Sequence, residues 1–203
     1  MTGKFITIEG SEGSGKSTII KAISEHLQAK GKEVVVTREP GGTETGEQIR
    51  NILLNKKNQK IHPETELLLM FAARAQHWQS LIKPKLKQGL WVVCDRFVDS
   101  SFAYQGGGRG IAISRIAQLE HWLLGDFKAD LTIFLDLEPK LGMQRAKKRG
   151  SLDRFEIEAI EFFNRVRTVY LARAKSQKNI HVIDASASLE QVKSNAISLL
   201  QKL

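Results

Sequence analysis

A glycine-rich loop near the start of the chain holds the residues whose types and spacing most clearly indicate chemistry. Gly10 is followed, after four residues, by Gly15, Lys16 and Ser17. This spacing is typical of a phosphate-binding loop between a strand and a helix. Glycines allow backbone angles that bring successive N–H groups around a polyphosphate. Lys16 would add charge for the outer phosphates, and the Ser17 hydroxyl is a suitable Mg²⁺ ligand.

The alternative, a chance match in a glycine-containing turn, is disfavoured because four positions must agree and an apolar strand and a helix flank the loop. The motif therefore predicts a site for a nucleoside triphosphate. Its residues are Gly10, Ser11, Glu12, Gly13, Ser14, Gly15, Lys16, Ser17 and Thr18.

An acid and an arginine follow another apolar run further along the chain. Asp95 would hold Mg²⁺, directly or through water, opposite Ser17. Arg96 has the planar guanidinium that suits bidentate phosphate binding. Plainer interpretations stay open for both: Asp95 as a helix cap or a solvated strand end, and Arg96 as a partner in a surface salt bridge.

Five short apolar runs predict the strands that position these residues. They are Phe5–Ile8, Val34–Thr37, Trp91–Cys94, Leu131–Leu135 and Ile180–Ile183. Continuous rather than alternating apolar residues are typical of a parallel sheet that is covered on both faces. Polar, charged or glycine residues follow every run. Because ligands of such sheets bind outside the carboxyl ends of the strands, we expect the site at that edge.

Helical segments alternate with these strands. The first has one apolar face and ends near Gly31. The full set is Ile19–Leu27, Leu67–Ile82 (stopped by Pro84), Arg115–Leu124 (ending at Gly125), Leu141–Arg149, Ile157–Lys175 and Leu189–Leu203. The alternation predicts one doubly wound α/β domain over residues 1–203, with right-handed crossovers.

The bulk composition excludes several classes of protein. The 203 residues are 41 % hydrophobic, with one cysteine, Cys94, so an internal disulfide framework is excluded. No secretory signal and no membrane-spanning run is present, which together predict a cytoplasmic protein without a membrane partner. The net charge of +9 raises the question of nucleic acid, but the basic residues are scattered. We predict no nucleic-acid partner and no zinc site.

Several longer segments resemble bacterial thymidylate kinase. They are Thr37–Thr43, Phe71–Arg74, Asp95–Phe97, Ser101–Gly110 and Leu152–Arg154. The similarity covers essentially the whole chain, and the Arg-Glu-Pro-Gly-Gly-Thr and Ala-Tyr-Gln-Gly segments are the most specific to that family. The resemblance implies the three-layer P-loop nucleoside monophosphate kinase fold, with a five-stranded parallel sheet. It also implies ATP as donor, Mg²⁺ as cofactor, dTMP as acceptor, dTDP as product, and a homodimer.

The resemblance further implies how the acceptor nucleotide is held. Phe71 would stack on thymine, although without the family it reads equally as a core phenylalanine. Arg74 lies one helical turn later on the same face and would reach a base carbonyl. Arg96 and Arg38 would bind the acceptor phosphate.

Four more residues would complete that acceptor site by resemblance. Ser101 and Gln105 match positions that address the thymine edge and its surroundings. Tyr104 matches a residue whose ring leaves no room for a ribose 2′-hydroxyl. Glu12 should point away from the phosphates, because they repel a carboxylate, and would accept a hydrogen bond from the sugar 3′-hydroxyl. Many family members have Asp there, and a solvated loop charge is the alternative.

The basic stretch at about 145–156 resembles the mobile lid of these kinases, which excludes water and neutralises transition-state charge. Some family members carry a catalytic arginine within the phosphate loop, where this chain has Ser17. The resemblance therefore implies the subtype whose catalytic arginine comes from the lid, either Arg149 or Arg154, with Arg154 preferred. A solvated basic helix is the alternative.

The resemblance implies an adenine site between Arg145 and Asp184–Ser186, where backbone groups such as those of Ala185 would matter most. No general base is needed, since the attacking phosphate oxygen is already ionised. The catalytic set is then Lys16, Arg96, Arg149 and Arg154.

Two rival functions stay open. One is another nucleotide or nucleoside kinase of the P-loop class, and the other is a basic, nucleic-acid-dependent ATPase. The segments Arg38–Thr43 and Ser101–Gly110 disfavour the second, since an ATPase switch needs no acceptor pocket. Phe97 departs from the family pattern, where tyrosine is common, which puts any polar contact from this position in doubt.

Overall fold

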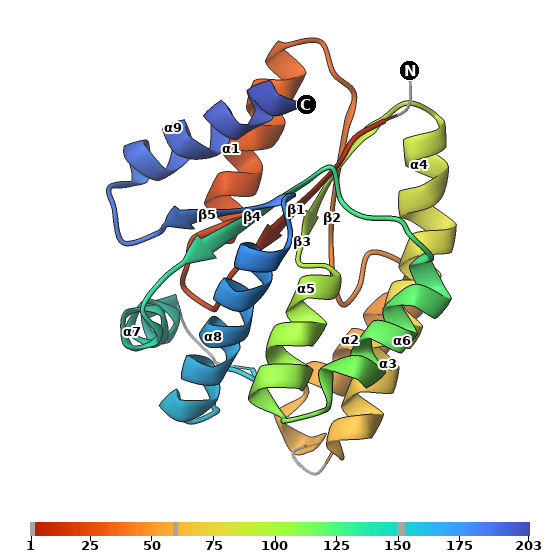
Figure 1. The fold of residues 1–203 in the computed structure, drawn as a ribbon, viewed down its shortest axis with the longest axis vertical. Coiled ribbons are helices and arrows are strands. Elements are labelled where there is room, and N and C mark those ends of the chain that lie inside the picture. The colour runs from red at the N-terminus through yellow and green to blue at the C-terminus, as the bar shows by residue number, and fades with distance from the viewer. Residues whose placement is uncertain (1–2, 59–60, 150–152) are drawn as a thin grey trace.

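Five parallel strands form the central sheet (Figure 1). The computed structural model describes residues 3–58, 61–149 and 153–203, except for the side chain of Arg149. The strands follow the order β2-β3-β1-β4-β5. They are β1 (Phe5–Glu9), β2 (Val34–Arg38), β3 (Trp91–Asp95), β4 (Leu131–Asp136) and β5 (Ile180–Asp184).

Each strand extends one charged residue beyond the apolar run that predicted it, and the five-stranded prediction is confirmed. The register explains the extension, because Asp95 pairs with Ile8 on one side and Arg38 on the other, and Asp136 pairs with Asp184. A ladder uses only backbone groups, so the charged side chains are free to serve the edge where ligands bind.

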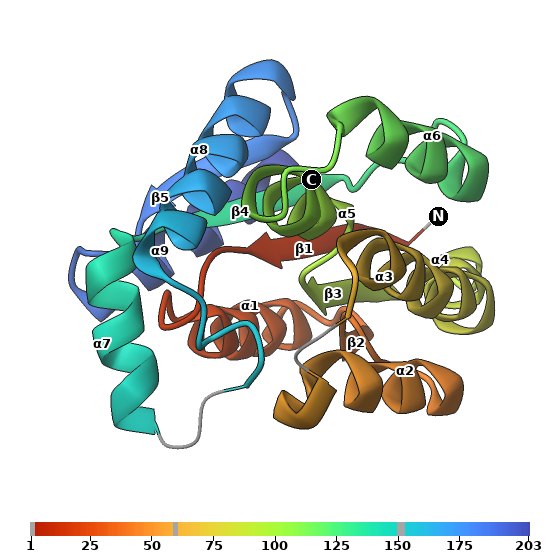
Figure 2. The same ribbon diagram turned by 90° about the horizontal axis from the view of Figure 1, so that it is seen from below.

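One face of the sheet is covered by α1 (Lys16–Ala29) and α9 (Leu189–Leu199). Ile6 and Ile8 of β1 pack with these helices in a fully buried cluster. Strand residues alternate between faces, so Phe5 and Glu9 lie on the opposite face. Figure 2 shows α1 on one side of β1, and α5 and α8 on the other.

The second face is covered by helices from the middle and later parts of the chain. Phe5 packs there with α3 and α6, while Phe134 of β4 packs with α8. The helices on this side or at its margin are α2 (Glu44–Leu54), α3 (Pro63–His77), α4 (Lys83–Lys87), α5 (Val98–Ser101), α6 (Ile113–Leu124), α7 (Pro139–Arg149) and α8 (Ile160–Ser176). Shorter 3-10 turns span Lys56–Asn58 and Leu200–Lys202.

The prediction that Pro84 stops the helix Leu67–Ile82 is wrong. A π-helical turn, Trp78–Ile82, joins α3 directly to α4, and the helical run continues to Lys87. The Lys83 N–H bonds to the Trp78 carbonyl, five residues back. This wider turn accommodates both the missing N–H and the ring of Pro84.

Two further regions of the structure, besides α4 and the short 3-10 turn at Lys56–Asn58, are helical without having been predicted so. The first is α2, whose N-cap Thr43 accepts a hydrogen bond from the Gly46 N–H. The second is α5 together with the π-helix η3 (Phe102–Gly108). Gly107 and Gly108 suggest a loop, but a Cβ at Gly107 would lie 2.8 Å from the Arg165 carbonyl oxygen of α8. These glycines therefore serve close helix packing rather than a turn.

Candidate active site

The phosphate loop leads from β1 directly into the N-terminus of α1. Gly15 is the N-cap of α1 at φ +92°, and no side chain caps the helix. A Cβ added at Gly15 would meet no atom within 4 Å, so space remains in front of the helix N-terminus. At Gly13 a Cβ would collide with the Gly142 carbonyl of α7. The loop thus presents N–H groups and a helix dipole to an anion.

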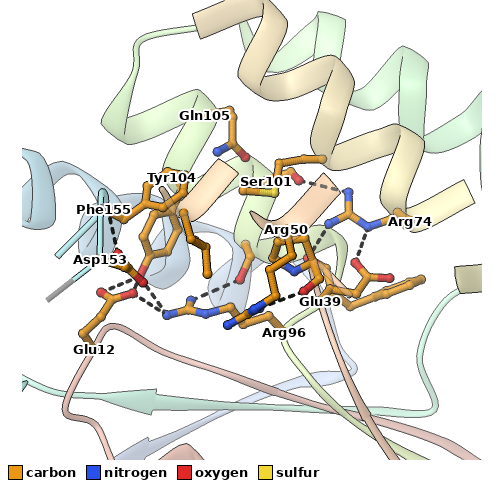
Figure 3. A pocket seen from close by; sticks show the side chains of 15 residues that line it. Glu12, Glu39, Arg50, Arg74, Arg96, Ser101, Tyr104, Gln105, Asp153 and Phe155 are labelled. Carbon is orange, nitrogen blue, oxygen red and sulfur yellow. Dashed lines mark hydrogen bonds and ion pairs between the residues drawn. The ribbon is translucent and has the colours of Figure 1, made fainter. Parts of the chain in front are cut away.

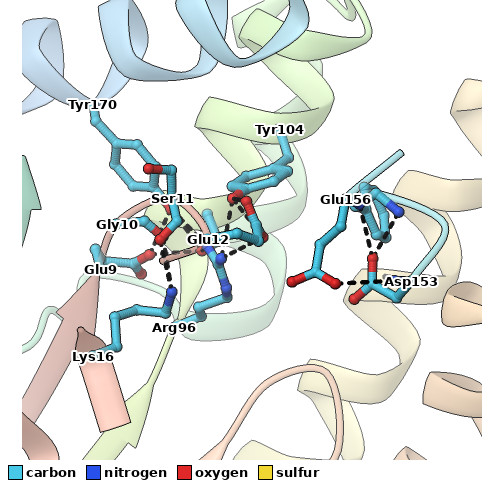
Figure 4. A network of polar contacts seen from close by, with 12 residues as sticks. Glu9, Gly10, Ser11, Glu12, Lys16, Arg96, Tyr104, Asp153, Glu156 and Tyr170 are labelled. Carbon is cyan, nitrogen blue, oxygen red and sulfur yellow. Dashed lines mark hydrogen bonds and ion pairs between the residues drawn. The ribbon is translucent and has the colours of Figure 1, made fainter. Parts of the chain in front are cut away.

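Lys16 is held inside the loop (Figure 4). Its Nζ donates to the carbonyl oxygens of Gly10 and Ser11, each at 3.1 Å. Burial, followed by the positive charge of Arg96, lowers the pKa of Lys16 below its ordinary value. A carbonyl oxygen binds an ammonium group more weakly than a phosphate oxygen does. A polyphosphate bound on the loop would therefore attract the Lys16 ammonium away from these two carbonyls.

Ser17 and Asp95 line one open cavity, together with Arg38. The Asp95 Oδ1 atom is buried and has no hydrogen-bond partner in the described part of the chain. An orphaned carboxylate oxygen of a cavity that a serine also lines fits Mg²⁺, which prefers oxygen ligands and keeps several waters. Among the described residues, no group of three His, Cys, Asp or Glu side chains could form a dedicated metal cage.

Arg96 lies at the centre of a polar network at the mouth of the loop (Figure 4). Its Nη2 donates to Glu12 Oε1 at 2.8 Å and to the Tyr104 hydroxyl at 3.0 Å, and that hydroxyl also donates to Glu12. Burial alone would lower the pKa of Arg96, but Tyr104 and Glu12 hold it well above its ordinary value. Arg96 therefore presents a permanent charge next to the phosphate loop.

The backbone of Arg96 is itself unusual. Its φ is +68°, a left-handed conformation that costs a non-glycine residue on the order of 1 kcal/mol or more. Its N–H bonds to the Ile8 carbonyl, and its own carbonyl accepts from the buried Cys94 thiol at 3.0 Å. From this backbone conformation the side chain reaches Glu12.

Glu9 supports this network from below. It is fully buried and accepts hydrogen bonds from the Phe97 N–H at 2.7 Å, the Ser100 hydroxyl at 2.6 Å and the Tyr170 hydroxyl at 2.8 Å. Burial, followed by the charge of Asp99, raises the pKa of Glu9 to about 7, although the hydrogen bonds and Arg96 oppose the shift. Glu9 thus ties β1 to the start of α5 and to α8.

This raised pKa predicts a pH-dependent contribution to stability. Between pH 4.5 and about 7 the folded protein holds the Glu9 proton more tightly than the unfolded chain. The contribution of Glu9 to the free energy of unfolding therefore falls as pH rises through that window. Glu9→Gln should remove this fall. In urea titrations, the free energy of unfolding of the wild type minus that of the variant should therefore decrease from pH 5 to pH 8. Glu25→Gln on the exposed surface of α1 is the matched control, and a constant difference for Glu9→Gln would contradict the assignment.

A second pocket lies beyond Arg96, between the loop and the middle helices (Figure 3). Arg74 is 2 % exposed and connects residues of the pocket wall through hydrogen bonds. Its Nε donates to Glu39 at 2.7 Å, and its Nη1 donates to the Ser101 hydroxyl at 2.9 Å. The pocket is lined by Glu12, Glu39, Pro40, Arg50, Leu54, Met70, Arg74, Arg96, Phe97, Ser100, Ser101, Tyr104, Gln105, Asp153 and Phe155.

The structure brings most of the predicted acceptor residues to this pocket but leaves two outside its lining. Phe71 is 5 % exposed within the apolar cluster, and the Arg74 guanidinium covers its ring at 4.7 Å. Arg38 lies in the cavity of Ser17 and Asp95 and pairs with Glu47 at 3.0 Å. Phe97, for which no role was predicted, lines the pocket instead.

The predicted lid residues separate in the structure. Arg145 Nη1 donates to the Ala185 carbonyl at 3.2 Å, which brings the two predicted adenine-side residues together. Arg154 is 4 % exposed and donates to the Leu53 carbonyl and to Glu66, each at 2.6 Å. The structure therefore does not bring Arg154 to the phosphate loop. The Arg149 side chain lies outside the described residues, as do positions 150–152.

Sequence reasoning missed several residues that line the pocket. Arg50 was missed because α2 was not predicted, although Thr43 followed by Glu44 is a recognisable helix start. Arg50 Nη1 donates to the Pro40 carbonyl at 2.7 Å. Asp153 and Phe155 reach the pocket only through tertiary contacts, for which the sequence holds no local signal.

Comparisons with known proteins agree with this geometry. The family model described as "Thymidylate kinase" matches residues 8–196. The chain belongs to the thymidylate kinase family. A thymidylate kinase of Ruthia magnifica subsp. Calyptogena magnifica is 54 % identical over 202 residues, which cover 99 % of this chain and 98 % of that protein. One of Pseudomonas fluorescens (strain SBW25) is 50 % identical over 204 residues, covering 100 % and 97 %.

A solved structure extends the likeness to three dimensions. The crystal structure of thymidylate kinase from Ehrlichia chaffeensis superposes with a TM-score of 0.81 at 36 % identity and covers 99 % of both chains. The fold and the thymidylate kinase activity expected from sequence are confirmed. Among the described residues, none of the helices combines the length and apolar composition that crossing a bilayer requires.

Proposed function

We propose that the chain transfers the γ-phosphoryl group of ATP to dTMP across the network of Glu12, Arg96 and Tyr104. One observation carries the proposal: Arg96 contacts Glu12 of the phosphate loop and Tyr104 of the second pocket at the same time. The triphosphate would lie on the loop and the monophosphate in the pocket. The reacting oxygen and phosphorus atoms would then meet beside Arg96.

Positioning and charge neutralisation are sufficient for this reaction. An ionised phosphate oxygen of dTMP attacks the γ-phosphorus, and the bond to the bridging oxygen of ADP breaks. No proton needs to be removed first. Lys16 would bind the outer phosphates of ATP. Arg96 would bind the acceptor phosphate and stabilise the negative charge that develops during transfer.

The lid arginine that completes this charge set is proposed to be Arg149 rather than Arg154. Arg154 would have to leave Glu66 and the Leu53 carbonyl, and breaking a buried ion pair costs on the order of 3–5 kcal/mol. Arg149 ends α7, the helix that touches the phosphate loop where Gly142 meets Gly13. With Arg149 in this role, the chain would belong to the subtype in which the lid supplies the arginine.

Mg²⁺ is proposed as the cofactor, held by the Ser17 hydroxyl and by Asp95, directly or through water. The orphaned Asp95 Oδ1 supports this assignment. When bound, the ion would neutralise oxygens of the transferring phosphoryl group. Asp95 and Ser17 line the same cavity, so one ion there could reach both residues.

An acceptor panel tests the proposed function. Turnover would be measured with ATP and dTMP, dUMP, dCMP, dGMP or AMP, with Mg²⁺ and with EDTA. We expect dTMP to be the best acceptor by a wide margin, and turnover to require Mg²⁺. A better acceptor than dTMP would assign another kinase of the class. ATP hydrolysis that DNA or RNA stimulates, without nucleotide phosphorylation, would assign the ATPase instead.

A homodimer is proposed from apolar side chains that the single chain leaves exposed. Trp122 of α6 is 84 % exposed, Leu68 of α3 58 % and Ile52 of α2 47 %. These three helices lie on the same side of the molecule in both views (Figures 1 and 2). Sedimentation should give twice the chain mass of 22.8 kDa, and Trp122→Glu should shift the protein toward monomer. As an ATP-dependent enzyme, the protein is proposed to act in the cytoplasm.

A further inference from the structure

We propose that Glu66 fixes the direction of the Gln105 amide, and through it selects bases that carry an N–H at the edge facing Gln105. The inference rests on the proposed function, because it concerns the base of the acceptor nucleotide. Glu66 belongs to α3, is completely buried and is not among the residues that line the pocket. It would therefore act as a positioning residue rather than a catalytic one.

The contact between the two side chains defines the amide direction. Gln105 Nε2 donates to Glu66 Oε1 at 2.9 Å. An ionised carboxylate only accepts hydrogen bonds, so the amide must turn its NH₂ group toward Glu66. Gln105 is 1 % exposed and lines the acceptor pocket beside Ser101 and Tyr104 (Figure 3). In the described part of the chain no donor is bonded to Gln105 Oε1, so this side of the amide offers an acceptor.

Glu66 is itself held in place by two arginines. Arg154 Nη2 donates to its Oε2 at 2.6 Å, and Arg109 Nε lies 3.2 Å from both oxygens. Arg109 Nη1 also donates to Glu158 at 2.5 Å. Two carboxylates and two guanidiniums balance in charge, which makes the burial of Glu66 tolerable. If the amide flipped, its carbonyl oxygen would face this fixed carboxylate, and two acceptors would meet with no hydrogen between them.

An acceptor on the pocket wall discriminates between pyrimidines. Thymine and uracil carry an N–H at N3, which can donate to a carbonyl oxygen. Cytosine has a lone pair at N3, which would face the Gln105 oxygen and leave both acceptors unsatisfied. Sites built to bond a substrate N–H reject analogues that lack it far more strongly than they reject a missing methyl group. Glu66 would therefore contribute to the rejection of cytosine by keeping the Gln105 oxygen turned toward the base.

The Glu66→Gln variant tests this assignment, because a glutamine at position 66 can either accept from or donate to Gln105. We would measure kcat/KM for dTMP, dUMP and dCMP. We expect the preference for dTMP over dCMP to fall at least tenfold, while the preference for dTMP over dUMP changes less than twofold. Glu158→Gln breaks the other ion pair of Arg109 without touching Gln105, and should leave both preferences as in wild type.

A second variant keeps the test decisive if Glu66→Gln does not fold. Gln105→Met removes the amide without changing the ion cluster, and should also lower the preference over dCMP at least tenfold. An unchanged preference over dCMP, or an equal fall over dUMP and dCMP, would overturn the inference while dTMP turnover stands. Failure of the wild-type protein to phosphorylate dTMP would instead overturn the proposed function.

Discussion

Replacing Lys16 by alanine should lower kcat by about 10²–10³-fold or more, the usual effect of removing one donor aimed at transition-state charge. The ammonium group now rests on the Gly10 and Ser11 carbonyls, 3.1 Å from each. Because burial and Arg96 lower its pKa, the group is poorly satisfied where it is, and phosphate oxygens would stabilise its charge. Its contribution should therefore be greatest when the γ-phosphoryl group carries charge in transit.

The fold and the acceptor pocket should survive this change. Lys16 is not among the residues that line the acceptor pocket, and its side chain donates to the Gly10 and Ser11 carbonyls, so the Kd for dTMP by calorimetry should change less than about threefold. Lys175→Ala, at an exposed position in the last turn of α8, is the matched control for loss of one lysine. Substantial turnover by Lys16→Ala, with the control unchanged, would remove Lys16 from the catalytic set.

The sheet was predictable because its information is local. Each strand is a run of apolar residues, and each run is followed by charged or polar residues, such as Asp95 or Asp184. Parallel strands bring those residues to one edge, which is why the phosphate loop, Asp95 and Arg96 could be assembled from sequence. The contacts that each of these residues makes, and the positive φ of Arg96, depend on packing from several elements and could not be predicted in this way.

The parts that sequence reasoning missed depend on partners far along the chain. The three glycines from Gly106 to Gly108 suggest flexibility, but they lie in a π-helix packed against α8. Arg154 suggests a mobile basic lid, but it pairs with Glu66, 88 residues earlier. Arg74 suggests a free base-binding group, but Glu39, Ser101 and the Phe97 carbonyl already hold it. Local composition cannot reveal which charges become buried in this way.

The pair of variants Arg149→Ala and Arg154→Ala should separate catalysis from structure in the lid region. Arg149→Ala should lower kcat by about 10³-fold, the lower range for an arginine that stabilises a transferring phosphoryl group. Its Kd for dTMP and its free energy of unfolding should stay close to wild type. Arg154→Ala should instead lower the free energy of unfolding by about 3 kcal/mol, because it leaves Glu66 with fewer partners and the Leu53 carbonyl unpaired.

Single-turnover kinetics with saturating ATP and dTMP, together with urea unfolding of each variant, would distinguish the two roles. The conservative variants sharpen the comparison, since Arg154→Lys retains charge beside Glu66 and should recover much of the stability, whereas Arg149→Lys should recover little of the rate. The opposite pattern, with Arg154→Ala losing the chemical step at unchanged stability, would return the catalytic role to Arg154. It would also require Arg154 to leave Glu66 during turnover, at a cost that the observed rate must then include.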